Sequence, residues 1–395
     1  MLFPPRNAIQ GGLLVLTATL FASGCTFYTQ CPPSNGNGNA AGAGGMGEAG
    51  GGQGNGTAGG APIPTGEWTN ASANLAGIPS ECGNMSGLSA KPDEDLLIAG
   101  IAQNGLWVSS DGGGDFSQLG TGKDSASIAN RMTTIVYDPD DTQRWWELGI
   151  YSVEGFFETT DNGKNFKLFP AAPGGDFVSI DLADPDRQTM LIGGHETPRA
   201  LDISRDGGET WTSIGKGLPD GTNCTHPVLI DPQTFLVGCG GYGGGPSGVY
   251  RSVDGGVKWT VASKDGGYGT PMRASDDSIY WLSPNGALTR STDDGKTWKL
   301  ATESGVLVGP TLVELPDGRI ASLSKRYVMI SDDLGKTWLP ASSQMPYDDS
   351  NPAVGLVYSV QQRAFFIWHS SCGFNGPVPV PDDAIMRYDF DYEAP

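Results

Sequence analysis

The chain has 395 residues, of which 60 are Gly and 28 are Pro, while only 17% are charged. This composition excludes a coiled coil or a helical bundle, which needs many more Glu, Lys, Leu and Ala. The formal net charge of −20 argues against nucleic acid as a partner, because affinity for nucleic acid rests largely on neutralising phosphates.

Residues 1–24 have the layout of a secretory signal peptide. One cation, Arg6, precedes the apolar stretch GGLLVLTATLFA, which is shorter than the roughly 20 residues of a membrane span. The ending ASGC resembles the bacterial lipobox, and this resemblance implies a lipoprotein that is lipidated on Cys25. Thr26, in place of Asp, then favours a lipid anchor in the bacterial outer membrane, with the folded part periplasmic or surface-exposed.

Residues 25–65 form a segment rich in Gly, Ala and Asn, without apolar periodicity. Such a segment buries too little surface to offset its ordering entropy, so we expect a flexible linker. A random coil of about 40 residues reaches roughly 35 Å, which would hold a folded domain clear of a bilayer. That domain is predicted over residues 66–395.

One motif recurs six times in this domain: Ser or Thr, any residue, Asp, any residue, Gly, two further residues and an aromatic. Each copy follows a short β-type run and precedes another, so it predicts a hairpin turn. The hydroxyl and the carboxylate can bond to backbone groups inside the turn, and the Gly can take a positive φ. A structural role is therefore predicted for the six Asp residues, which are Asp111, Asp161, Asp206, Asp254, Asp293 and Asp333.

A second shared feature lies upstream of the middle copies. Asp138-Pro139, Asp184-Pro185 and Asp231-Pro232 each separate two β-type runs. Each unit is therefore predicted to hold four strands, A to D, with the Asp motif at the turn from C to D.

The motif resembles the BNR or Asp-box repeat of β-propellers, which is found in sialidases, the sortilin ectodomain, xyloglucan-cleaving glycosidases and photosystem assembly factors. The resemblance covers residues 66–395 and implies an all-β propeller of four-stranded antiparallel blades. Blades of about 47 residues divide this length into seven, six of them with an Asp-box. The strand around Trp68 is expected to complete the seventh blade and to close the ring, which removes exposed sheet edges.

The propeller also predicts how the cysteines pair. Its D-to-A and B-to-C connections share one face, here called the top face, and disulfides persist in an exported protein. The pairs Cys224 with Cys239 and Cys82 with Cys372 are predicted there, leaving Cys31 unpaired in the linker. No Cys spacing typical of a metal or redox site is present, so neither a metal nor a cofactor is expected.

Ligands of propellers usually bind at the top-face mouth of the central channel. All three His of the chain map to this face, together with several Arg and Tyr. The candidate ligand-binding residues are Arg131, His195, Glu196, Arg199, His226, Tyr242, Arg273, Tyr347 and His369. Paired carboxylates such as Asp348-Asp349 are expected to be solvated turns.

Two main hypotheses follow for function. The favoured one is a monomeric, non-catalytic lipoprotein that binds a glycan, a peptide or an envelope protein at the top face. The alternative is a carbohydrate-active enzyme at the same face, either a sialidase-like exo-glycosidase or a related hydrolase or lyase. A sialidase would need Arg131, Arg199 and Arg273 to converge on a carboxylate, but the Arg-Ile-Pro motif of sialidases is missing. A third possibility is an assembly chaperone like the photosystem factors.

Overall fold

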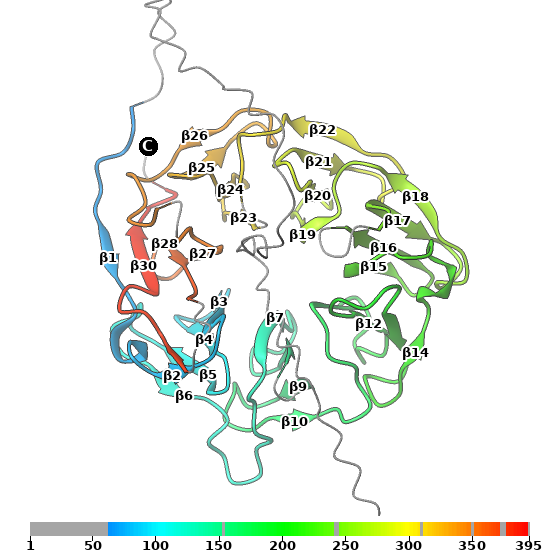
Figure 1. Ribbon diagram of the computed structural model, residues 1–395, viewed down its shortest axis with the longest axis horizontal. Coiled ribbons are helices and arrows are strands. Elements are labelled where there is room, and N and C mark those ends of the chain that lie inside the picture. The colour runs from blue at the N-terminus through cyan, green and yellow to red at the C-terminus, as the bar shows by residue number, and fades with distance from the viewer. Residues whose placement is uncertain are drawn as a thin grey trace, which may run out of the picture. The chain divides into compact units, whose positions relative to one another are not determined.

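The computed structural model describes residues 62–151, 155–240, 245–308, 311–348, 351–371 and 377–393. These residues form seven four-stranded antiparallel sheets, arranged as the blades of a propeller (Figure 1). The predicted seven-bladed fold is therefore confirmed. The signal peptide, the linker, Cys25 and Cys31 lie outside the described residues.

The first three blades follow the chain in order. Blade 1 holds β3 (Met85–Ala90), β4 (Leu97–Ile101), β5 (Gly105–Ser109) and β6 (Ser117–Gln118). Blade 2 holds β7 (Arg131–Tyr137), β8 (Trp145–Ile150), β9 (Gly155–Thr159) and β10 (Lys167–Leu168). Blade 3 holds β11 (Phe177–Ile180), β12 (Met190–Gly193), β13 (Leu201–Ser204) and β14 (Thr212–Ser213).

The next three blades repeat this order. Blade 4 holds β15 (Cys224–Asp231), β16 (Thr234–Cys239), β17 (Gly248–Ser252) and β18 (Thr260–Ser263). Blade 5 holds β19 (Tyr268–Arg273), β20 (Ile279–Leu282), β21 (Leu288–Ser291) and β22 (Lys299–Thr302). Blade 6 holds β23 (Leu312–Glu314), β24 (Ile320–Leu323), β25 (Val328–Ser331) and β26 (Leu339–Pro340).

Blade 7 joins the two ends of the domain. Its strands are β27 (Gly355–Ser359), β28 (Ala364–Trp368), β30 (Ile385–Asp389) and β1 (Trp68–Asn70), with Trp68 opposite Tyr388. A separate two-stranded sheet pairs β2 (Pro79–Ser80) with β29 (Val378–Pro379). The remaining elements are two 3-10 turns, η1 (Ala73–Leu75) and η2 (Gly215–Gly217).

The six Asp-motif turns share one set of hydrogen bonds. In the last copy, the Ser331 hydroxyl donates to Asp333 Oδ1 (2.9 Å) and accepts from the Gly335 amide (2.9 Å), while the Thr337 amide donates to the same carboxylate oxygen (2.8 Å). These bonds, chiefly the one from Thr337, hold the pKa of Asp333 at about 2. The equivalent bonds recur in the other five copies, so each Asp is committed to its own turn.

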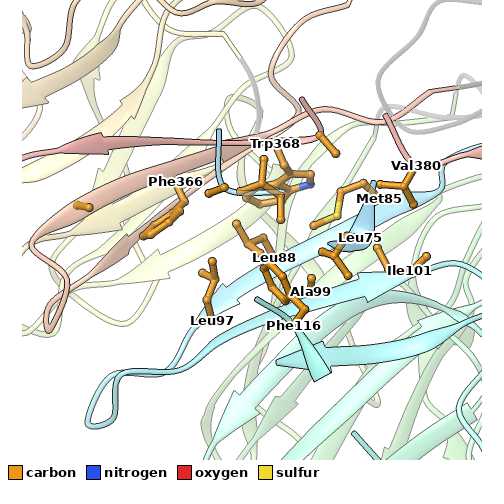
Figure 2. Close-up of a cluster of buried hydrophobic side chains, with 14 residues drawn as sticks. Leu75, Met85, Leu88, Leu97, Ala99, Ile101, Phe116, Phe366, Trp368 and Val380 are labelled. Carbon is orange, nitrogen blue, oxygen red and sulfur yellow. The ribbon is translucent and has the colours of Figure 1, made fainter. Parts of the chain in front are cut away.

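The core lies between blades and not at the centre of the ring. The seam of blades 7 and 1 buries Leu88, Ala99, Phe116, Phe366 and Trp368, with η1 covering one side (Figure 2). Alternating residues of the B strands face opposite seams: Trp145 of β8 packs toward blade 1 and Trp146 toward blade 3. Packing between blades therefore fixes the positions of the loops on the top face.

Candidate functional site

The top face, where each B strand ends and the next A strand begins, carries a network centred on His195. His195 follows β12, and its Nδ1 lies 2.8 Å from Asp176 Oδ1, just before β11. Its Nε2 lies 2.6 Å from the phenol oxygen of Tyr151, which follows β8. The Asp-His-Tyr arrangement thus joins the top ends of blades 2 and 3.

Arg131 extends the network toward blade 1. Its guanidinium lies 4.7 Å from the centroid of the Tyr151 ring, and its Nε donates to Glu81 Oε1 over 3.0 Å. The other oxygen of Glu81 accepts a hydrogen bond from Gln103 (2.9 Å). The network therefore spans three adjacent blades.

Burial and charge set the protonation of this network. Only 3% of the Asp176 side chain is exposed, and burial raises its pKa even though His195 acts in the opposite direction. Glu196 Oε1 lies 3.4 Å from His195 Nε2, and a third of the Glu196 side chain is exposed. Tyr151 and Glu196 are accordingly the two groups with which His195 Nε2 can exchange a proton.

Backbone strain coincides with the network. Gln103, Tyr151 and Glu196 all have φ between +49° and +67°, the left-handed region that side chains other than Gly seldom adopt. Strained residues of this kind cluster at functional sites, because the surrounding structure must hold them in place.

Four predicted residues, Arg199, His226, Tyr347 and His369, lie on the top face but apart from His195. Arg199 pairs with the exposed Asp220. His226 is buried in β15 beside Phe177, and burial lowers its pKa to about 4. Tyr347 donates to the Asp383 carbonyl (2.9 Å) and packs against His369, whose Nε2 lies 3.0 Å from the Asp383 carboxylate.

Arg273 was predicted to lie on the top face, and this prediction is wrong. Strand β19 begins at Tyr268, directly after the positive-φ glycines Gly266 and Gly267, so Arg273 is its last residue. There it pairs with Asp277 in the turn from A to B, on the opposite face. Arg131, Arg199 and Arg273 consequently do not converge as a sialidase would need.

The predicted disulfide between Cys224 and Cys239 is present and joins the first residue of β15 to the last of β16. Cys82 is disulfide-bonded, while its predicted partner Cys372 lies outside the described residues, as does Tyr242. Within the described ranges, no three His, Cys, Asp or Glu side chains gather to hold a metal ion. No helix in that part of the chain has the length and apolarity to cross a bilayer.

Sequence analysis missed four members of the network: Tyr151, Asp176, Glu81 and Gln103. Tyr151 and Gln103 follow the ends of B strands by one and two residues, Asp176 directly precedes the A strand β11, and Glu81 lies four residues before the A strand β3. These are the positions that place a side chain on the top face. Screening every polar residue at those positions, and not only His and Arg, would have found them.

No protein-family model matches the chain. In an alignment of 213 positions that covers 45% of this chain, the chain is 25% identical to a xyloglucanase from a Paenibacillus species, of which the match covers 21%. The fold is similar to a GH74 enzyme from Niastella koreensis (TM-score 0.55, 16% identity, 78% of this chain and 53% of that one). It is also similar to a GH74 xyloglucanase from Xanthomonas campestris (TM-score 0.52, 17% identity, again 78% and 53%). YCF48 bound to D1 peptide has the same fold (TM-score 0.53, 12% identity, 85% of this chain and 100% of that one).

The chain thus spans about a fifth of the curated relative it matches and about half of each GH74 enzyme. Similarity to a xyloglucanase contradicts the favoured hypothesis of a non-catalytic binding protein. The comparison supports the alternative, a carbohydrate-active enzyme.

Proposed function

We propose that this chain is a glycoside hydrolase for a neutral, glucan-type polysaccharide and that it acts through the top-face network around His195. The sequence similarity to a xyloglucanase is the observation that supports this reaction class. The fold alone would not support it, since propellers host both enzymes and binding proteins.

The chemistry of the network suits hydrolysis of a glycosidic bond. Such hydrolysis needs one group to protonate the leaving oxygen and another to assist attack at the anomeric carbon. Asp176 orients His195 through Nδ1, so Nε2 can take the proton of the Tyr151 phenol while the phenol oxygen takes one from the water that attacks the anomeric carbon. Glu196, when protonated, gives its proton to the leaving oxygen and recovers one from His195 Nε2, which lies 3.4 Å from Glu196 Oε1.

The local charge favours a neutral substrate. The network holds three carboxyl groups, those of Glu81, Asp176 and Glu196, and one guanidinium, that of Arg131, which already pairs with Glu81. An anionic sugar would meet net repulsion here, whereas the hydroxyls of a neutral glucan can bond to these acceptors.

The test is release of reducing ends from xyloglucan and other β-glucans by the purified chain. We expect His195→Asn and Tyr151→Phe each to lower kcat by about 100-fold or more, because each removes a group from the proton-transfer chain. The matched control is Tyr358→Phe, which deletes a phenol that donates to the Phe390 carbonyl in blade 7 (2.9 Å), outside this network.

The proposal fails if the wild-type chain, folded by circular dichroism, releases no reducing ends from any of these glucans. It also fails if Tyr151→Phe retains activity equal to that of the Tyr358→Phe control, because the network would then not be the reactive site.

A further inference from the structure

Exposed aliphatic side chains gather on the outer part of three consecutive blades. They lie on the D strands and C-to-D turns of blades 4 to 6, and 43–70% of each residue is exposed. Strands β18, β22 and β26 run along the rim of the ring (Figure 1). We call this surface the outer wall; its members are Val253, Val257, Val261, Leu300, Leu334 and Leu339.

The fold does not require aliphatic residues at these positions. Two residues after the motif aromatic, blades 4 and 5 carry Val261 and Leu300, whereas blades 1 and 3 carry Gln118 and Ser213. All four positions are exposed on equivalent D strands. Exposed aliphatic side chains that are separate but confined to adjacent blades offer a surface that a partner can cover.

The charge of this region differs from that of the rest of the chain. Residues 251–339 contain 11 Lys and Arg and 11 Asp and Glu, whereas the whole chain contains 24 and 44. The entire net charge of −20 therefore lies outside the region. Lys258, Lys299 and Lys336 lie within or beside the outer wall and are exposed. Blades 4 to 6 are consequently the part of the ring that an anionic surface would not repel.

The chain enters the domain beside the same rim. The described residues begin at 62, and β1 forms the outer edge of blade 7 (Figure 1). Trp68 of β1 packs toward blade 6, where its indole donates to the Ser343 carbonyl (3.3 Å). Any anchor in the preceding 61 residues is therefore connected next to blade 6, which carries one end of the outer wall.

We propose that the outer wall docks on a lipid bilayer. Its separate aliphatic side chains can enter the interfacial region while the neighbouring Lys side chains reach headgroup phosphates. The C-to-D turns lie on the face opposite to the His195 network. Docking would therefore turn that network away from the bilayer, toward a large substrate.

The test is flotation of the chain, expressed from residue 26 so that it carries no acyl group, with vesicles of phosphatidylethanolamine and a minority of phosphatidylglycerol. We expect the triple change Val257→Ser, Leu300→Ser, Leu339→Ser to lower the vesicle-bound fraction by about tenfold or more, because three apolar side chains no longer leave water. The control is Val306→Ser, an aliphatic residue that is 39% exposed and lies outside the wall.

Several outcomes would overturn docking on lipid. The first is a wild-type chain that stays with the unbound fraction, and the second is a triple variant that floats as well as Val306→Ser. A third is a change of oligomeric state in the triple variant without loss of flotation, which would assign the wall to a protein contact. Because the wall lies away from the His195 network, glucan hydrolysis by the triple variant should be unchanged, so failure here is distinguishable from failure of the proposed function.

Discussion

Glu147 is a fully buried carboxyl in β8 with an incomplete set of hydrogen bonds. Asn130 Nδ2 donates to its Oε2 over 3.2 Å, whereas Glu147 Oε1 and Asn130 Oδ1 are both buried without a partner. Burial, opposed by the Asn130 hydrogen bond, raises the pKa of Glu147 to about 8. If Glu147 is protonated on Oε1, that hydroxyl can donate to Asn130 Oδ1, and both atoms then have a partner. The neutral acid is therefore the form that suits the site.

The free energy of unfolding should therefore fall as the pH rises from 5 to 9. In the folded chain Glu147 keeps its proton up to a pH of about 8, whereas in the unfolded chain it loses the proton near the ordinary pKa of 4.5. The contribution of Glu147 to stability is therefore fully present below pH 4.5 and is lost as the pH rises to about 8. The slope is at most about 1.4 kcal/mol per pH unit. Glu147→Gln keeps a neutral group of the same shape and should remove the contribution of Glu147 to this slope in urea denaturation, leaving that of Asp176, whose pKa burial also raises.

The control for this prediction is Glu303→Gln, which changes an exposed carboxylate and should leave the slope as in the wild type. If the free energy of unfolding depends on pH in the same way in the wild-type chain and in Glu147→Gln, then Glu147 is ionised, or not buried, in solution.

Neighbouring blades are tied together at the turns from A to B, on the face opposite the candidate site. Arg187 of blade 3 bonds to Asp138 of blade 2 through Nε (3.1 Å) and Nη2 (2.5 Å), and Nη2 also bonds to Asp140 (2.7 Å). Its Nη1 donates to the Asp184 carbonyl (2.5 Å). Burial raises the pKa of Asp138, but the contacts of Asp138 with Arg187 outweigh this effect and keep the pKa below its ordinary value.

Removing one partner of this buried pair should be costly. Arg187→Met leaves Asp138 buried without its guanidinium, and we expect a loss of about 3–5 kcal/mol in the free energy of unfolding. The double change Arg187→Met, Asp138→Leu should recover much of it. Lys167→Met is the matched control, because the Lys167–Glu209 pair also joins blades 2 and 3 but is more than half exposed, which limits the expected loss to about 1 kcal/mol or less.

Urea denaturation of these variants at pH 7 would measure the differences. Equal losses for Arg187→Met and Lys167→Met would contradict a stabilising role for the buried contacts between blades 2 and 3.

These elements also explain what the sequence could and could not predict. The Asp-motif turn is local: hydroxyl, carboxylate and Gly lie within five residues, so the pattern alone predicts its place at the C-to-D turn. The face on which Arg273 lies depends on the residue at which β19 starts. That strand begins directly after two glycines, at Tyr268, so Arg273 is its last residue and not a residue before it. The contact of His195 with Tyr151 and Asp176 depends on how blades 2 and 3 pack, so no local pattern contains it.

At the scale of the whole molecule, one short strand closes the ring. Strand β1 pairs with β30 over Trp68–Asn70, and the Trp68 ring lies 5.1 Å from that of Tyr388. Without β1, the edge of β30 would expose its unpaired backbone groups and part of the apolar seam between blades 6 and 7. Because every other blade takes its four strands from one continuous stretch of chain, blade 7 is where the ring is expected to open first.

A chain that begins at residue 71 should therefore unfold at a lower temperature than one that begins at residue 62. We expect a loss of a few degrees, since a loss of 1 kcal/mol shifts the melting temperature of a domain of 150–250 residues by roughly 2–4 °C, and that of a larger domain by somewhat less. Adding a peptide of residues 62–70 in trans should restore part of the loss, because the edge of β30 remains free to pair. Calorimetry would measure the melting temperatures of the chains that begin at residues 62 and 71, with the full-length chain as control. If both truncated chains melt together with the full-length chain, β1 does not hold the ring closed, and the packing between blades suffices.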